Sequence, residues 1–141
     1  MSHFTRHRIV IVALLCLIAF RADAQDGGAR RIFYIGLGLY SEQWSENDVV
    51  DLATRLQSVS RLRVLPAFAS NVSPARRRYP VADDATVAAL IGAAARQAGP
   101  GDLVFVGIST HGAPKLLARK VGNAPPTELS ARELARWLAP L

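Results

Sequence analysis

Cysteine is almost absent from this chain. The only one, Cys16, lies in an apolar N-terminal stretch. Residues 25–141 therefore offer no thiol for a disulfide and must be held together by packing alone. They also contain a single histidine, His111. A metal site built from histidine and cysteine is excluded on these counts, and we expect no bound metal.

Long hydrophobic runs are missing except near the N-terminus. Residues 1–24 begin with basic side chains, continue through the apolar run 9–20 and end in Ala22-Asp23-Ala24. The run is too short to span a bilayer comfortably. A basic start, a short apolar run and a small-x-small site are typical of a secretory signal peptide. We predict a signal peptide over 1–24, a linker over 25–30 and export to the periplasm or beyond. Membrane attachment is not expected after cleavage, and the alternative is an uncleaved anchor.

A strong charge of one sign is also lacking. The formal net charge is +6, and the excess is spread along the chain. The one cluster, Arg76-Arg77-Arg78, has a single aromatic neighbour, Tyr79. A solvated loop fits this pattern better than a phosphate-binding site, so we expect no nucleic-acid partner.

Strand and helix patterns alternate from residue 31 onward. Apolar runs predict strands over 31–40, 62–66 and 103–109. Helical spacing follows a cap at Ser45 and another at Asp83 or Asp84. Residues 112–128 look irregular, and Ser130 to Glu133 forms a capping box that opens a last helix. This alternation predicts one α/β domain over 31–141, with a short, mainly parallel sheet in the order 2-1-3 and helices on both faces.

Two glycines near the first strand suggest another function. Gly36 and Gly38 match part of a dinucleotide-binding fingerprint, but Ser41 stands where the third glycine belongs. A tight chain reversal is the preferred interpretation. We expect no cofactor.

The third predicted strand ends in Ser109-Thr110-His111-Gly112. Parallel α/β sheets carry their chemistry at the carboxyl ends of strands, which makes His111 the first candidate for a functional residue. The alternative is a structural turn histidine that is hydrogen-bonded to backbone.

This strand and turn resemble those of the legumain-type cysteine peptidases, in the caspase and legumain superfamily. Gly101-Asp102 before the strand, the acidic Asp48 and the segment 129–134 agree with the resemblance. It implies a three-layer α/β/α caspase-like sandwich that hydrolyses peptide bonds in peptides or proteins. It also implies that His111 is the catalytic base of a Cys-His dyad and that Gly112 is an oxyanion donor.

The chain departs from this family at the nucleophile. In the family a cysteine follows the next strand, whereas residues 25–141 contain none. The resemblance therefore covers an amino-terminal part only, and the chain as given is expected to be inactive. Ser109 is a poor substitute, because neighbouring residues at a strand end point in different directions.

Two further expectations follow from the incomplete sheet and the altered pocket. The edge beside the third strand should be bare and open to self-association. Glu42 stands where the family has a basic residue, and it would favour a basic substrate side chain. The alternative function is a catalytically inactive, exported α/β module that binds a peptide or a partner around His111.

Overall fold

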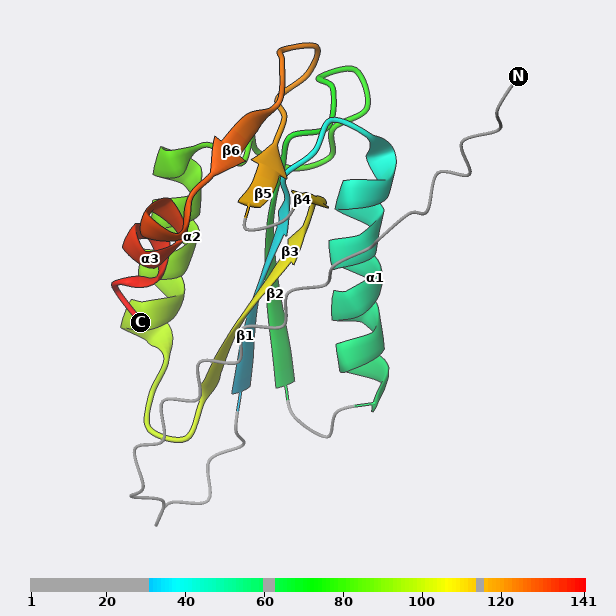
Figure 1. Ribbon diagram of the computed structural model, residues 1–141. Helices are drawn as coiled ribbons and strands as arrows, with labels where there is room; N and C mark the ends of the chain where they lie inside the picture. The colour runs from blue at the N-terminus through cyan, green and yellow to red at the C-terminus, as the bar shows by residue number, and fades with distance from the viewer. Residues whose placement is uncertain (1–30, 60–62, 114–115) are drawn as a thin grey trace, which may run out of the picture.

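The computed structural model describes residues 31–59, 63–113 and 116–141. The predicted signal peptide and linker, over 1–30, lie outside these residues and stay predictions. The chain alternates strands and helices, as Figure 1 shows. In chain order the elements are β1 (Arg31–Gly38), α1 (Gln43–Val59), β2 (Arg63–Ser70), α2 (Asp84–Gln97), β3 (Leu103–Ser109), β4 (His111–Ala113), β5 (Leu116–Arg119), β6 (Thr127–Leu129) and α3 (Ala131–Leu138).

The three longest strands form a parallel sheet in the order β2-β1-β3, which confirms the predicted order. Ile32 of β1 lies opposite Val64 of β2 and Leu103 of β3. The central strand is buried on both faces, which explains why its sequence is continuously apolar rather than alternating. Within the described residues, β3 forms the outer edge of this sheet.

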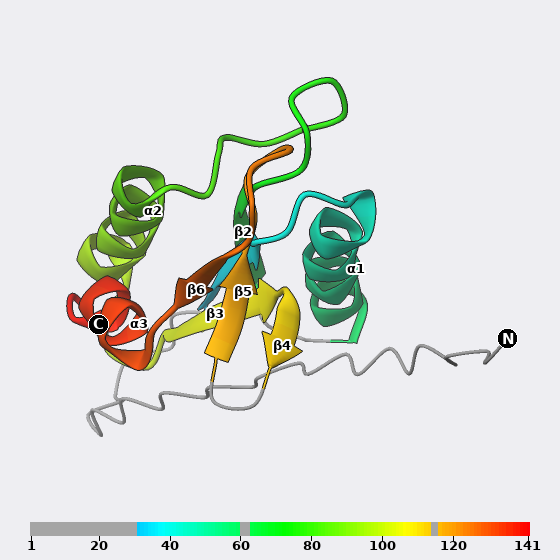
Figure 2. The same ribbon diagram turned by 45° about the horizontal axis from the view of Figure 1, so that its top comes forward.

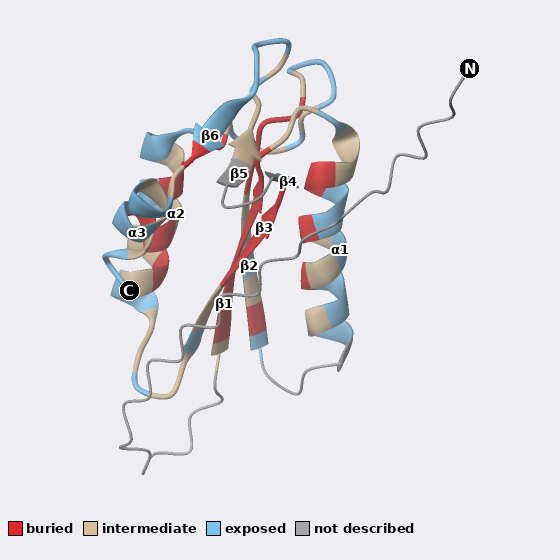
Figure 3. Ribbon diagram, viewed as in Figure 1, coloured by how far each residue is buried: buried red, intermediate tan, exposed pale blue. Residues whose placement is uncertain are grey.

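Helices cover both faces of the sheet. Figures 1 and 2 show α1 on one side and α2 with α3 on the other. Alternate residues of β1 face opposite sides of the sheet. Ile32 and Tyr34 pack in a cluster with Ala53 of α1. Phe33 and Ile35 belong to the larger cluster on the α2 side. Figure 3 shows the buried residues concentrated on the strands and on the inward faces of the helices. The fold is therefore α/β with a helical layer on each face.

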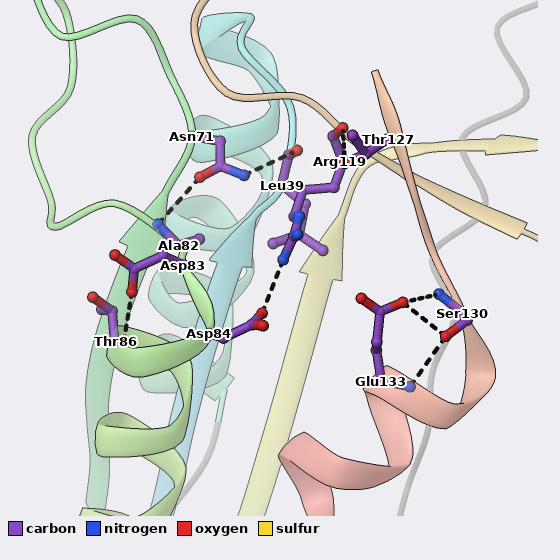
Figure 4. A network of polar contacts seen from close by, with 10 residues as sticks. All are labelled: Leu39, Asn71, Ala82, Asp83, Asp84, Thr86, Arg119, Thr127, Ser130 and Glu133. Carbon is purple, nitrogen blue, oxygen red and sulfur yellow. Dashed lines mark hydrogen bonds and ion pairs between the residues drawn. The ribbon is translucent and has the colours of Figure 1, made fainter. Parts of the chain in front are cut away.

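The helix ends show which local signals were correct. Asp83 caps α2 and accepts a hydrogen bond from the backbone N–H of Thr86. The capping box of Ser130 and Glu133 is present at α3, as Figure 4 shows. Ser45 is not an N-cap, because α1 begins at Gln43. The Ser45 hydroxyl instead donates to the carbonyl of Tyr40 over 2.8 Å, which closes the turn into the helix.

Two boundaries differ from the sequence prediction. The second strand extends to Ser70 instead of ending at Pro66. Because β2 is an edge strand, it tolerates a proline within it. The first strand is shorter than expected and ends at Gly38.

The expectation of an irregular segment over 112–128 is wrong. Strands β4, β5 and β6 form a separate antiparallel sheet in that order. These strands are three or four residues long, so no hydrophobic period could reveal them. Contacts with distant parts of the chain hold the small sheet in place.

The small sheet is attached at the carboxyl end of the parallel sheet. The backbone N–H of Lys120 donates to the carbonyl of Leu39 over 2.8 Å. Asn71 bridges two segments there: its side chain donates to the carbonyl of Leu39 and accepts from the N–H of Ala82. Figure 4 shows this bridge and the ion pair that joins Arg119 to Asp84 at the start of α2. Several segments of the chain are therefore tied together at the end of the sheet where His111 lies.

Candidate active site at the carboxyl end of the parallel sheet

His111 is the first residue of β4 and follows the edge strand β3 after a single residue. The end of β3 is fixed to the segment after β1, because the N–H of Leu39 donates to the carbonyl of Ser109 over 2.9 Å. Ser109 and Thr110 are buried, whereas His111 is exposed. The fold thus brings one exposed imidazole out of a buried strand at the end where α/β sheets carry functional residues.

Two aromatic rings contact His111. The ring centroids of Tyr40 and His111 are 4.3 Å apart with planes 84° to each other. Those of Trp44 and His111 are 5.0 Å apart at 71°. Tyr40 belongs to the connection between β1 and α1, and Trp44 to the first turn of α1. We call Tyr40, Trp44 and His111 the aromatic cluster; no local sequence pattern indicates that these three rings meet.

The hydroxyl groups that precede His111 are both engaged. Ser109 Oγ donates to Asp48 Oδ2 over 2.8 Å. Thr110 Oγ1 donates to the carbonyl of Ala118 in β5. A serine whose proton is held by a carboxylate is not paired with the imidazole as a nucleophile requires. This geometry agrees with the prediction that Ser109 does not replace the missing cysteine.

Gly112, the expected oxyanion donor, lies in β4 opposite Leu117 of β5. It directly follows His111 in the chain, so the two predicted site residues are neighbours by sequence, and the structure places both on β4. We call the surface around His111, at the carboxyl end of the parallel sheet, the rim. Asp48, singled out for its acidic character, also reaches this rim through Ser109.

Glu42 has a partner that the sequence did not reveal. Its Oε1 lies 4.0 Å from Nζ of Lys120, and the same Nζ lies 5.5 Å from the centroid of the Tyr40 ring. A cation of the chain already balances Glu42, which weakens the expectation that Glu42 selects a basic substrate side chain. Lys120 is far from Tyr40 in sequence and carries no local signal, so only the fold could place it here.

A buried ion pair lies beneath the rim. Glu46 is 0% exposed, and the half-exposed Arg78 donates from Nε to its Oε1 over 2.5 Å. Burial raises the pKa of Glu46, but hydrogen bonds from Arg78, Ser70 and Gln43 outweigh it and hold the pKa below its ordinary value. Part of the arginine cluster is thus structural: it fastens residues 71–82 to the start of α1.

The two glycines of the partial dinucleotide fingerprint lie inside β1, not in a turn. The preferred interpretation as a tight chain reversal is therefore wrong. A Cβ on Gly38 would meet the carbonyl oxygen of Ser45 at 2.9 Å. One on Gly36 would meet the Phe68 ring at 2.7 Å. The glycines allow α1 and β2 to approach β1 closely, which is a packing role rather than phosphate binding.

No cluster of three or more potential metal ligands converges in the described part of the chain. Nor does any helix there have the length and apolarity needed to cross a bilayer. A comparison of the chain with protein-family models, curated proteins and solved structures finds no match.

Proposed function

We propose that this chain carries the histidine half of a cysteine-peptidase site of the legumain or caspase type, within a caspase-like α/β/α sandwich. The observation that carries the proposal is the position of His111. It is an exposed imidazole directly after the buried edge strand of a parallel sheet whose order is β2-β1-β3. The resemblance to the legumain-type peptidases implies a catalytic histidine at such a strand end.

The chemistry assigns one role to each of two residues. His111 takes the proton of a thiol, and the thiolate then attacks the carbonyl carbon of the scissile peptide bond. The resulting imidazolium gives its proton to the leaving amine, and water releases the acyl group from sulfur. The backbone N–H of Gly112 would stabilise the negative oxygen of the tetrahedral intermediate. The substrate class is a peptide or an unfolded segment of a protein.

The thiol must come from outside residues 25–141, because they contain no cysteine. A further parallel strand against β3 would end about 4.8 Å from it, within side-chain reach of the imidazole. The outer edge of β3 is the place for such a strand, since no other described strand pairs there.

One observation favours a second function. The chain as given has no thiol outside its predicted leader, yet its rim exposes His111 beside two aromatic rings. Aromatic side chains with polar neighbours are common at binding surfaces. In this alternative the chain is an inactive, exported module that binds a peptide or a partner protein.

Reading the coding sequence past the codon for Leu141 separates the two functions. The peptidase proposal expects an apolar strand that ends in a small residue and cysteine. The longer protein should cleave peptides, and His111→Ala should abolish cleavage while Ser109→Ala leaves most of it. A stop codon after Leu141 would contradict the dyad in this polypeptide and favour the binding module.

Export is proposed together with this function. The N-terminus of the protein recovered from the periplasm or the medium is expected to be Gln25. A protein that retains residues 1–24 in the membrane fraction would overturn the cleavage prediction.

A further inference from the structure

The aromatic cluster is anchored on more than one side. Beyond their contacts with His111, the Tyr40 and Trp44 rings lie 6.0 Å apart and nearly parallel, at 28°. The carbonyl of Tyr40 accepts from the Ser45 hydroxyl, and Lys120 Nζ lies over the Tyr40 ring. The ring that contacts His111 most closely is thus itself held by neighbours.

One helix contacts both the Ser109 side chain and the His111 ring. Asp48 binds Ser109, and Trp44 contacts His111. Trp44 and Asp48 are four residues apart on α1 and so lie on the same face, about 6 Å apart along its axis. A single face of α1 therefore contacts both Ser109 and His111.

We propose that Tyr40 and Trp44 are positioning residues, whose rings hold the imidazole of His111 in one orientation at the rim. An exposed histidine ordinarily samples several rotamers. Here two rings meet the imidazole close to perpendicularly, the edge-to-face arrangement that aromatic pairs favour. The effect of this positioning on catalysis rests on the function proposed above, whereas the contact between the rings does not.

Proton nuclear magnetic resonance tests directly whether the two rings hold the imidazole of His111 in one orientation. The chain is labelled at its histidines, and the signals of His111 are assigned as those that are lost in the His111→Gln variant. We expect cross-relaxation from its ring protons to those of Tyr40 and Trp44. We also expect ring-current shifts away from the signals of the urea-unfolded chain. Absence of both effects in the unaltered chain overturns the proposal without any reliance on variants.

Substitutions then separate ring contact from general packing. Tyr40→Phe keeps the ring and should keep the shifts, whereas Tyr40→Leu and Trp44→Leu should each lose part of them. Tyr79→Leu is the matched control, because the Tyr79 ring packs on Phe68, with centroids 4.8 Å apart. It should leave the His111 signals in place. Unchanged signals in folded Tyr40→Leu and Trp44→Leu chains would overturn the proposal.

Activity of the longer, cysteine-containing protein tests the catalytic meaning. Tyr40→Leu should lower kcat on the order of 10-fold to 100-fold with little change in KM, and Tyr40→Phe should restore it. If the wild-type protein cleaves peptides but both Tyr40 variants match it, the positioning role is wrong and the peptidase proposal stands. If the ring contacts are present and His111→Ala leaves cleavage unchanged, the peptidase role of His111 is wrong and the holding stands.

Discussion

The two ends of the parallel sheet are built differently. At the amino end, a charged pair joins β1 to the start of β3: Arg31 and Asp102 are linked by backbone and side-chain hydrogen bonds. At the carboxyl end, an exposed imidazole lies against aromatic rings. The first end uses its charges to hold strands together. At the second end, His111 is exposed.

Asp102 at the amino end is bound by two segments of the chain. Its carboxylate accepts from Arg31 N at 2.9 Å, Nε at 3.1 Å and Nη2 at 2.6 Å, and from Gly99 N at 2.8 Å. Hydrogen bonds from Arg31, with smaller help from Gly99, lower its pKa to about 2 against burial. Three of these four bonds end on Oδ2 and one on Oδ1, so the carboxylate ties the start of β1 to the turn before β3. This end is structural.

At the carboxyl end, the bonded polar groups are buried and the histidine is exposed. Glu46, Asn71 and Ser109 are buried there and are bonded to neighbouring segments. His111 lies above them on the rim and is exposed. The difference teaches that the buried polar groups tie the segments of the rim together, whereas His111 is exposed on it.

The largest expected effect comes from placing a side chain where α1 packs closely against β1. Gly38→Ala should lower the free energy of unfolding by about 3 kcal/mol, because its Cβ would meet rigid backbone of Ser45. Gly92→Ala in α2 is the control, since its Cβ would meet only the flexible end of Arg96. That change should raise stability by about 0.5–1 kcal/mol. Urea unfolding followed by circular dichroism measures both, and a neutral Gly38→Ala would refute the close approach.

The next effect concerns the ion pair under the rim. Arg78→Met should cost about 2–3 kcal/mol at neutral pH, because it leaves the Glu46 carboxylate buried without its cation. Its neighbour Arg77 is the matched control, and Arg77→Met should change stability by less than about 0.5 kcal/mol. Without Arg78 the pKa of Glu46 rises, so the deficit should shrink as the pH falls. Equal effects of the two substitutions in chemical unfolding would show that the pair is not structural.

A smaller and pH-dependent effect belongs to the amino end. The pKa of Asp102 is about 2 in the folded chain against an ordinary 3.8. A lowered folded pKa adds stability that is complete above pH 4 and is lost as the pH falls toward 2. Asp102→Asn should cost about 1–2 kcal/mol at pH 7, because Arg31 is partly exposed and screened.

Thermal unfolding between pH 2 and 7 measures this contribution. The wild-type and Asp102→Asn curves should converge as the pH approaches 2. Asp84→Asn is the control, because Asp84 is largely exposed in its pair with Arg119. A constant gap between wild type and Asp102→Asn across this range would refute the assignment.

The smallest expected effect sharpens the contrast between the two ends. His111→Ala should change the unfolding free energy by less than about 1 kcal/mol, since only exposed ring contacts are lost. Calorimetry on the two chains measures the difference. A cost of several kcal/mol would favour the alternative of a structural turn histidine.

Local chemistry made much of the fold predictable. The apolar runs of β1 and β3 indicate buried strands, and Asp83 and Ser130 mark helix starts, because these signals act within a few residues. His111 as a candidate followed from its place after an apolar run. The start of α1 and the end of β2 differ from the prediction, because contacts with neighbouring elements decide where a helix begins and where strand pairing ends.

By itself, the sequence determined the alternation of strands and helices, the parallel order β2-β1-β3 and the emergence of one histidine at a strand end. Only the tertiary structure decided the antiparallel sheet β4-β5-β6, the burial of Glu46 against Arg78 and the contact of Tyr40 and Trp44 with His111. Glu46 and Arg78 are 32 residues apart, and Arg31 and Asp102 are 71 apart. Such pairs form only after the chain has closed long loops, and no pattern within a short window encodes which distant residues will meet.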